Sequence, residues 1–229
     1  MILCFRPRLC AENFVYQGGD DCIALKPNST DIYMRNVTCW GGTGIALGSI
    51  AQYEGVQDII ENVVMEDINL FASNQCLGFQ GVYAKSWIGE SHGIPPNGGG
   101  GGNGYAKNIT FRNVFMKDII HPIAVDTTLT YLPDVKGKPD IKGSQFQWSD
   151  IVFDNFTGTA TGNRVVWMDC PKHLPCHDFT FRNIDIKPGK TDHPEISFVC
   201  NNIVMEGADG LQQCHTSNST LEMENDGTM

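Results

Sequence analysis

Apolar and polar residues alternate with a period of two in six short phrases that are spread along the chain. Each phrase begins with Asn or Asp, continues with apolar residues two positions apart, and usually contains a second Asn or Asp. Alternation of this kind indicates a β-strand with one buried face. The phrases begin at Asp31, Asn62, Asn108, Asp150, Asp178 and Asn202.

A second series of short apolar phrases is interleaved with the first. Its members are CIAL from Cys22, GIAL from Gly44, PIAV from Pro122 and VVWM from Val165, and the first two start 22 residues apart. No helical periodicity separates the two series, so they predict a solenoid of stacked coils without helical repeats. An antiparallel sandwich is the alternative. Near-identical phrases that recur in register favour an all-β fold, a parallel β-helix, with an Asn ladder between coils.

Two insertions interrupt this frame. Residues 88–104 contain Pro95, Pro96 and the run Gly98–Gly102, a composition that predicts a flexible surface loop. A phosphate-binding loop is excluded because no Lys-Ser/Thr follows the glycines. Residues 129–145 form a second, smaller insertion, and we treat 1–229 as a single domain with a C-terminal tail over 215–229.

Charge and hydrophobicity narrow the classes of partner. The chain has 16 basic and 26 acidic residues, which argues against nucleic acid and anionic membranes as partners. No apolar run approaches the roughly 18 residues that span a bilayer, so no membrane association is expected. The six histidines show no metal-ligand spacing. We therefore expect a monomer without metal or cofactor.

Cysteines and sequons point to the secretory pathway. Six of the nine cysteines form three close pairs, which we predict to be disulfides. Buried free thiols are the alternative. The pairs are Cys22–Cys39, Cys170–Cys176 and Cys200–Cys214, which leave Cys4, Cys10 and Cys76 over. Asn-X-Ser/Thr sequons occur at Asn28, Asn36, Asn108, Asn155 and Asn218. An extracellular glycoprotein is expected, although the first residues lack a signal-peptide pattern.

Candidate chemistry begins in the segment Gly18-Gly19-Asp20-Asp21-Cys22. Adjacent carboxylates tend to separate their pKa values, which suits acid/base catalysis, although Gly-Asp is also ordinary turn chemistry. The interval of 22 residues places Thr43 beside Asp21 in the next coil. Lys85 interrupts a further apolar strand and either faces the same column or is a solvated surface lysine.

These motifs together resemble glycoside hydrolase family 28, the polygalacturonases and rhamnogalacturonan hydrolases. The resemblance runs from about residue 13 to Cys214 and includes GGDDCIALKP, ENVVMEDINLF, GVYAKSW and NITFRNV. It implies a right-handed parallel β-helix that cleaves pectin with inversion. It also implies that Asp20 is the general acid and that Asp21 is the base that activates water. Inverting hydrolysis requires about 6.5–9.5 Å between the two carboxyl groups.

Three departures from the family pattern change this expectation. The Asn-Thr-Asp motif one coil earlier is absent, and Glu12 is the one acid upstream of Asp20. The Gly-His-Gly motif is here Gly42-Thr43-Gly44, and Arg-Ile-Lys is Tyr83-Ala84-Lys85. Loss of the His and Arg resembles exo-acting or rhamnogalacturonan-specific members, with a sugar packed on the Tyr83 ring.

We expect Thr43, Tyr83, Lys85 and Trp87 to bind a pectic polysaccharide. Further candidates for the cleft are Trp40, Tyr53 and Tyr105, and His121 and Asp126, which flank PIAV, whereas Trp167 is expected in the core.

A non-catalytic carbohydrate-binding remnant and an unrelated structural β-helix are the alternatives. We further expect the 229 residues to lack N-terminal coils of a longer secreted protein, and the chain alone to be poorly soluble or inactive.

Overall fold

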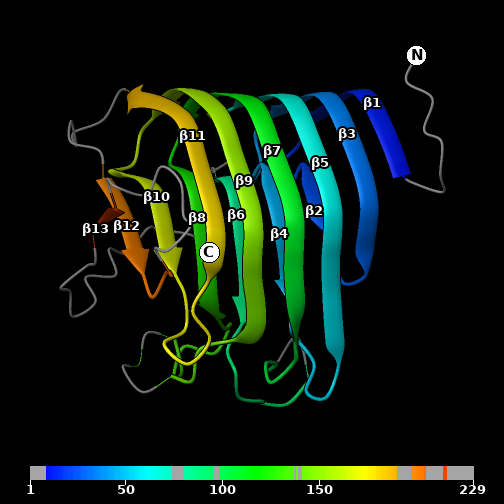
Figure 1. Ribbon diagram of the computed structural model, residues 1–229, viewed down its shortest axis with the longest axis vertical. Helices are drawn as coiled ribbons and strands as arrows, with labels where there is room; N and C mark the ends of the chain where they lie inside the picture. Colours follow the sequence, from blue (N-terminus) through cyan, green and yellow to red (C-terminus); the bar gives the residue numbers. More distant parts are fainter. Residues whose placement is uncertain are drawn as a thin grey trace.

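The computed structural model describes residues 9–73, 80–94, 98–136, 138, 141–189, 197–204 and 214–215. Within these ranges the regular elements are β-strands in two parallel sheets, and the chain passes from one sheet to the other in each coil. Figure 1 shows the successive coils stacked side by side from β1 to β12. The predicted all-β parallel β-helix is confirmed.

Successive strands of the chain alternate between the two sheets, apart from the last two, which belong to the same sheet. The six-stranded sheet has the order β1 (Leu9–Gln17), β3 (Ser29–Trp40), β5 (Gln57–Phe71), β7 (Asn103–Ile119), β9 (Gln145–Ala160) and β11 (His177–Pro188). The seven-stranded sheet has the order β13 (Cys214–His215), β12 (Ser197–Asn201), β10 (Arg164–Asp169), β8 (His121–Leu129), β6 (Gln80–Trp87), β4 (Ile45–Ile50) and β2 (Ile23–Leu25). Five of the six NITFRNV-like phrases lie in the first sheet and the CIAL-like phrases lie in the second. The sixth phrase, from Asn202, follows β12 and extends beyond the described residues.

The Asn and Asp residues of the repeated phrases bend the long strands. Asn62 and Asp67 of β5 have φ values of 58° and 57°, and Asn108 and Asn113 of β7 have 53° and 55°. Asn and Asp tolerate this left-handed conformation better than other side chains that carry a Cβ atom. Five-residue spacing therefore sets two such bends in β5 and in β7, and the six-stranded sheet curves around the core (Figure 1).

The bends also carry the predicted side-chain ladder. At the second bend, the Asn36 amide donates to Asn13 Oδ1 at 2.6 Å, and Asn155 donates to Asn113 Oδ1 at 3.0 Å. At the first bend, Asn108 donates to Asn62 Oδ1 at 2.7 Å. Coils in register thus satisfy one another's side-chain amides along the helix axis.

The core lies between the two sheets and is rich in Phe. Phe111, Phe153 and Phe181 occupy the same register position in β7, β9 and β11. Their rings stack with centroid distances of 5.7 Å and 5.0 Å on either side of Phe153. All three side chains are buried, so each coil contributes apolar area to its neighbours.

The glycine run is packed against the coils, contrary to the prediction of a flexible surface loop. All of Gly98–Gly102 except Gly101 are buried. A Cβ atom on Gly99 would lie 2.9 Å from the Trp87 ring, and one on Gly102 would lie 2.7 Å from the Ala51 backbone. The glycines are therefore explained by close approach to the coils, because no larger side chain would fit there.

Three disulfides were predicted from the close cysteine pairs, and all three are present: Cys22–Cys39, Cys170–Cys176 and Cys200–Cys214. Cys10, which the pairing left over, is disulfide-bonded as well. Cys4 and Cys76 lie outside the described residues, as do Asn218 and most of the expected tail over 215–229.

The described segments contain no helix that is long and apolar enough to cross a membrane. The same segments contain no group of three or more His, Cys, Asp or Glu side chains placed to hold a metal ion.

Candidate active site

Asp20 and Asp21 lie in the turn between β1 and β2, at the end of the seven-stranded sheet. The Asp20 carboxylate accepts a hydrogen bond from the Asp21 N–H at 2.7 Å. Asp20 is exposed, whereas the Asp21 side chain is only 12% exposed. Two carboxylates that are adjacent in sequence thus occupy different environments, as divided acid and base roles require.

The turn before β4 stacks directly on the Asp20–Asp21 turn. The Thr43 N–H donates to the Asp20 carbonyl oxygen at 3.3 Å. Gly42 has a φ of 74°, and a Cβ atom there would lie 2.0 Å from the same oxygen. Glycine at position 42 is therefore required for the second coil to approach the candidate acid.

Thr43 and Lys85 hold the Asp21 carboxylate from the next two coils. The Thr43 hydroxyl donates to Asp21 Oδ1, and Lys85 Nζ lies 3.5 Å from Asp21 Oδ2. The prediction that Thr43 lies beside Asp21 is confirmed, and Lys85 faces the same column. Both oxygens of Asp21 therefore have a partner from another coil.

Tyr83 supports Lys85 and is itself tied to the following coil. Lys85 Nζ lies 5.2 Å from the centroid of the Tyr83 ring, and the Tyr83 hydroxyl donates to Asp126 Oδ2 at 3.2 Å. Burial raises the pKa of Tyr83 well above its usual value, and the charge and hydrogen bond of Asp126 raise it further. Tyr83 therefore stays a hydrogen-bond donor, and Lys85 covers its ring.

A polar row continues from Lys85 along the same sheet. Lys85, Asp126, Asp169 and Asn201 occupy matching register positions in β6, β8, β10 and β12. Asn201 Nδ2 donates to Asp169 Oδ1 at 3.3 Å. Burial raises the pKa of Asp169, the Asn201 hydrogen bond opposes this shift, and the charge of Asp126 adds to it. Two carboxylates thus face one another beyond Lys85.

Sequence reasoning included Asp126 but missed Asp169 and Asn201. The signal was present in the parallel phrases PIAVD and VVWMD, which both end in Asp, followed by FVCN at the next strand. Without the register, however, the intervals between these phrases did not show that the three residues line up.

Two aromatic residues lie differently from their predictions. Trp87 was expected to bind substrate, but its side chain is fully buried and packs edge-on against Tyr131 at a centroid distance of 4.9 Å. Trp167 was expected in the core, but it is partly exposed, with the Arg164 guanidinium 5.9 Å from its ring and His121 at 6.0 Å. Strand alternation turns Trp167 outward, on the same face as Asp169. Trp87 has the parity of the outward Lys85, but the register shifts between Lys85 and Trp87, and the glycine run packs on the Trp87 ring and buries it.

The other aromatic candidates are more scattered. Trp40 and Tyr53 are 44% and 50% exposed. Trp40 ends β3 and stacks on Phe71 at 4.1 Å. Tyr105 belongs to the six-stranded sheet, where its hydroxyl donates to Glu61 at 3.2 Å. Tyr105 is therefore on the other sheet from Lys85.

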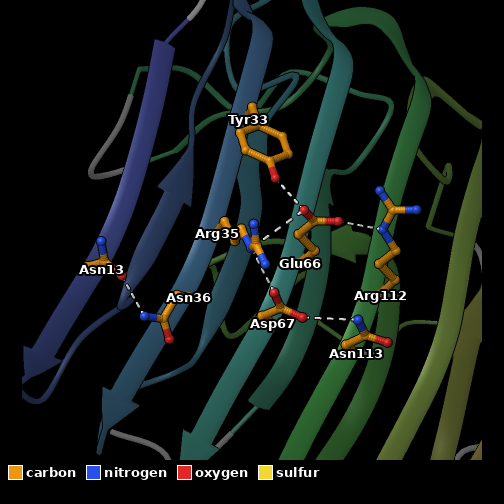
Figure 2. A network of polar contacts seen from close by, with 8 residues as sticks. All are labelled: Asn13, Tyr33, Arg35, Asn36, Glu66, Asp67, Arg112 and Asn113. Atoms are coloured by element: carbon orange, nitrogen blue, oxygen red, sulfur yellow. Dashed lines mark hydrogen bonds and ion pairs between the residues drawn. The ribbon is translucent and has the colours of Figure 1, made fainter. Parts of the chain in front are cut away.

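The outer face of the six-stranded sheet carries a separate ionic network (Figure 2). Glu66 on β5 accepts hydrogen bonds from the Tyr33 hydroxyl on β3 and from Arg112 Nε on β7, the latter at 2.6 Å. Asp67 accepts from Arg35 Nε at 2.9 Å and from Asn113 at 3.0 Å. These partners satisfy one another, so the network has the character of a structural cluster.

A cavity of about 220 Å³ adjoins this network, lined by Glu12, Asn13, Arg35, Asn36 and Asp67. Glu12 therefore lies on the six-stranded sheet, opposite Arg35 in register, and not beside Asp21. We locate the candidate active site by its adjacent carboxylates, because Arg35 and Asp67, which line this cavity, are already paired with each other.

The chain is thus a parallel β-helix with two adjacent carboxylates at the end of one sheet. The family model of glycosyl hydrolases family 28 matches residues 10–209. The chain belongs to this family.

Individual relatives agree with this assignment. A protein of Aspergillus flavus, provisionally named galacturan 1,4-alpha-galacturonidase A, is 42% identical over 205 residues, which are 85% of this chain and 47% of the relative. An exopolygalacturonase of Cochliobolus carbonum is 32% identical over 94% of this chain and 46% of its own length. An alpha-L-rhamnosidase (rgxB) of Aspergillus niger is 35% identical over 87% of this chain and 45% of its own length. The chain thus spans about half the length of the curated relatives it matches.

Among solved structures, the endo-xylogalacturonan hydrolase of Aspergillus tubingensis superposes with a TM-score of 0.71. The match covers 92% of this chain and 50% of that structure, at 18% sequence identity. At this identity the likeness supports the β-helical fold alone.

Proposed function

We propose that the Asp20–Asp21 turn hydrolyses glycosidic bonds at the end of a pectic polysaccharide, with inversion of configuration. The observation that carries this proposal is the different environment of the two carboxylates. Asp20 is exposed at the surface. The Asp21 carboxylate accepts a hydrogen bond from the Thr43 hydroxyl and lies 3.5 Å from Lys85 Nζ.

In this mechanism Asp20 acts as the general acid. Its carboxyl group gives a proton to the glycosidic oxygen as the bond to the anomeric carbon breaks. A water molecule attacks that carbon from the opposite face and gives its proton to Asp21. Thr43 and Lys85 hold the Asp21 carboxylate in place. Inverting hydrolysis requires about 6.5–9.5 Å between acid and base, which leaves room for the water.

The charges along the sheet favour a short stretch of acidic sugar. Lys85 supplies a cation next to Asp21, whereas Asp126 and Asp169 follow it in the next two coils. A uronate is attracted at Lys85 and repelled one or two coils further on. This pattern suits attack at a chain end better than binding of a long polygalacturonate, in keeping with the relatives named as exo-acting enzymes.

We also propose that the protein works outside the cell as a monomer without a cofactor. Three disulfides between described cysteines support an oxidising compartment.

The test is product analysis at high protein concentration on oligogalacturonides and on rhamnogalacturonan fragments, with the anomer of the product read by NMR. We expect slow release of monosaccharide with inverted configuration, and loss of that release in Asp20→Asn. The rate is expected to be low because, in the described turn, Asp21 alone is placed to act as the base, without a second carboxylate to help activate the water. A rapid fall in polygalacturonate viscosity would overturn the chain-end assignment.

A second candidate function is carbohydrate binding without hydrolysis. It is favoured because Glu12, the one acid upstream of Asp20, lies on the other sheet and does not join Asp21 in activating a water. The test is calorimetry with a uronate oligosaccharide. Binding without any product would establish this second function in place of hydrolysis, if the affinity is unchanged in Asp20→Asn and weakened in Lys85→Met.

A further inference from the structure

Four of the sequons lie on described residues, and exposure does not distinguish them. Asn28, Asn36, Asn108 and Asn155 are all exposed and all have left-handed φ values between 53° and 65°. By accessibility alone each is a possible acceptor for an N-glycan. Their side-chain amides, however, are used in different ways.

Three of the four are rungs of the ladder at the strand bends. Asn36, Asn108 and Asn155 donate their side-chain nitrogen to the preceding coil at 2.6, 2.7 and 3.0 Å. An N-glycan is attached through that same nitrogen. The sugar would replace one of its hydrogens and enter a stack in which neighbouring strands lie about 4.8 Å apart.

The ladder does not depend on the sequon. Asn62, Asn113 and Asn183 are rungs that no Ser or Thr follows at the required spacing, and they donate to Asp31, Asp67 and Asp154 at 3.2, 3.0 and 3.3 Å. The rung is therefore a property of the bend, whatever lies two residues further on.

Strand geometry explains how the rung sequons arise. After Asn108, Ile109 points into the core and Thr110 is partly exposed. The same alternation of a buried apolar residue and an outward Thr follows Asn36 and Asn155. Thr is favoured on strands, so an Asn at a bend often acquires the sequon pattern as a by-product.

Asn28 differs from these three. It lies in the turn between β2 and β3, in the segment Asn28-Ser29-Thr30. Within the part of the chain that the structure describes, its side chain has no hydrogen-bond partner. A sugar at this position would extend into solvent without breaking a contact between coils.

We infer that Asn28 carries the N-glycan in the described part of the protein, and that Asn36, Asn108 and Asn155 are structural rungs that stay unmodified in the folded, secreted form. Chains that receive a sugar on a rung lose a contact between coils and are retained in the cell.

The direct test is glycopeptide mapping of the chain expressed through a eukaryotic secretory pathway, with secreted and cell-retained fractions analysed separately. We expect the sugar at Asn28 in the soluble, folded material and rung glycans only in retained material. Thr30→Ala, which keeps Asn28 but removes its sequon, should lower the mass by one glycan. A rung occupied as highly as Asn28 in folded protein would overturn the inference.

A second test needs no glycosylation. In bacterially produced chain, Asn108→Gln should lower the melting temperature by about 2–4 °C, the cost of one ladder hydrogen bond in a protein of this size. The rung Asn113→Gln, which has no sequon, should lower the melting temperature at least as much, because Asn113 both donates to Asp67 and accepts from Asn155. Asn28→Gln has the same left-handed backbone cost at a φ of 65° but loses no ladder bond, so it should lower the melting temperature by less than Asn108→Gln does. Equal effects of Asn108→Gln and Asn28→Gln would contradict the structural role of the rung.

Discussion

The outer faces of the two sheets both carry carboxylates, and they hold them in opposite ways. On the six-stranded sheet, burial alone would raise the pKa of Glu66, but hydrogen bonds from Tyr33 and Arg112 outweigh it and the pKa is lowered. Asn113 and Arg35 likewise lower the pKa of Asp67. On the seven-stranded sheet, burial raises the pKa of Asp169.

The pKa values of Tyr33 and Tyr83, the tyrosines beside these carboxylates on the two sheets, shift in the same direction. Burial and the hydrogen bond to Glu66 raise the pKa of Tyr33 to about 12, and Tyr83 shifts in the same direction beside Asp126. What differs is the supply of cations. Two arginines form ion pairs with Glu66 and Asp67 (Figure 2), whereas in the other row Lys85 lies next to Asp21 and the charge of Arg164 only partly opposes the raised pKa of Asp169.

This difference separates stability from function. A carboxylate with matched donors stabilises the fold when it is ionised. A carboxylate that is buried beside another one costs stability, and such arrangements gather at functional sites. The six-stranded face therefore has the features of a scaffold, and we propose that the seven-stranded face carries the chemistry.

The largest expected effect tests that division directly. Asp20→Asn should reduce the rate of product release by roughly 10²–10⁴-fold, the usual contribution of a general acid. Because Asp20 is exposed, the melting temperature should not change. Glu66→Gln on the opposite face should leave the rate unaltered. Reducing-sugar assays and thermal denaturation of both variants decide the matter, and a comparable loss of rate in Glu66→Gln would remove the distinction.

The next effect concerns the covalent link between the two faces. Cys22 lies beside Asp21 and is bonded to Cys39 of β3 on the other sheet. Replacing both by Ser should cost about 2–4 kcal/mol of unfolding free energy, measured by urea denaturation. The pair Cys170–Cys176 closes a loop with a sequence separation of only 6, against 17 for Cys22–Cys39, so its removal should cost less. The reverse order would show that the first coil is not held by this bond.

A smaller effect is expected within the ionic network. Glu66→Gln removes a charge that both Tyr33 and Arg112 contact, but the network lies at the surface, so the loss should be about 1 kcal/mol or less. Glu61→Gln is the matched control on the same strand, since Glu61 lies 3.8 Å from Lys107 and its side chain is 26% exposed, against 14% for Glu66. Urea denaturation should rank Glu66→Gln as the more destabilising change.

The smallest effect separates the faces by pH. The pKa of Glu66 is lowered on folding, so its contribution is present above the unfolded pKa of about 4.3 and is lost as pH falls through the folded value. The pKa of Asp169 is raised, so its cost is absent below the unfolded pKa of about 3.9 and grows as pH rises to the folded value.

Melting temperatures recorded against pH should therefore move in opposite directions. At pH 7, Asp169→Asn should be more stable than the parent chain and Glu66→Gln less stable. Both differences should shrink toward pH 3. A destabilised Asp169→Asn at pH 7 would mean that Asn201 and Arg164 compensate the buried charge fully.

Much of this architecture is determined by the sequence itself. Alternating phrases that begin and end with Asn or Asp define the strands and their bends, because Asn and Asp tolerate left-handed φ values where other residues do not. The interval of 22 residues between CIAL and GIAL places Thr43 on Asp21, because stacked parallel coils repeat in register. The motif around Asp20 identifies the candidate chemistry.

Only the tertiary structure decided which side chains meet across unequal coils. The intervals vary with the insertions, so the alignment of Lys85, Asp126 and Asp169 depends on strand pairing and cannot be read from spacing. The burial of Trp87 follows from the glycine run that packs on it. The sequons at Asn28 and Asn108 likewise have different surroundings. Asn108 donates a hydrogen bond to the preceding coil and Asn28 does not, and such a bond exists only once the coils are stacked.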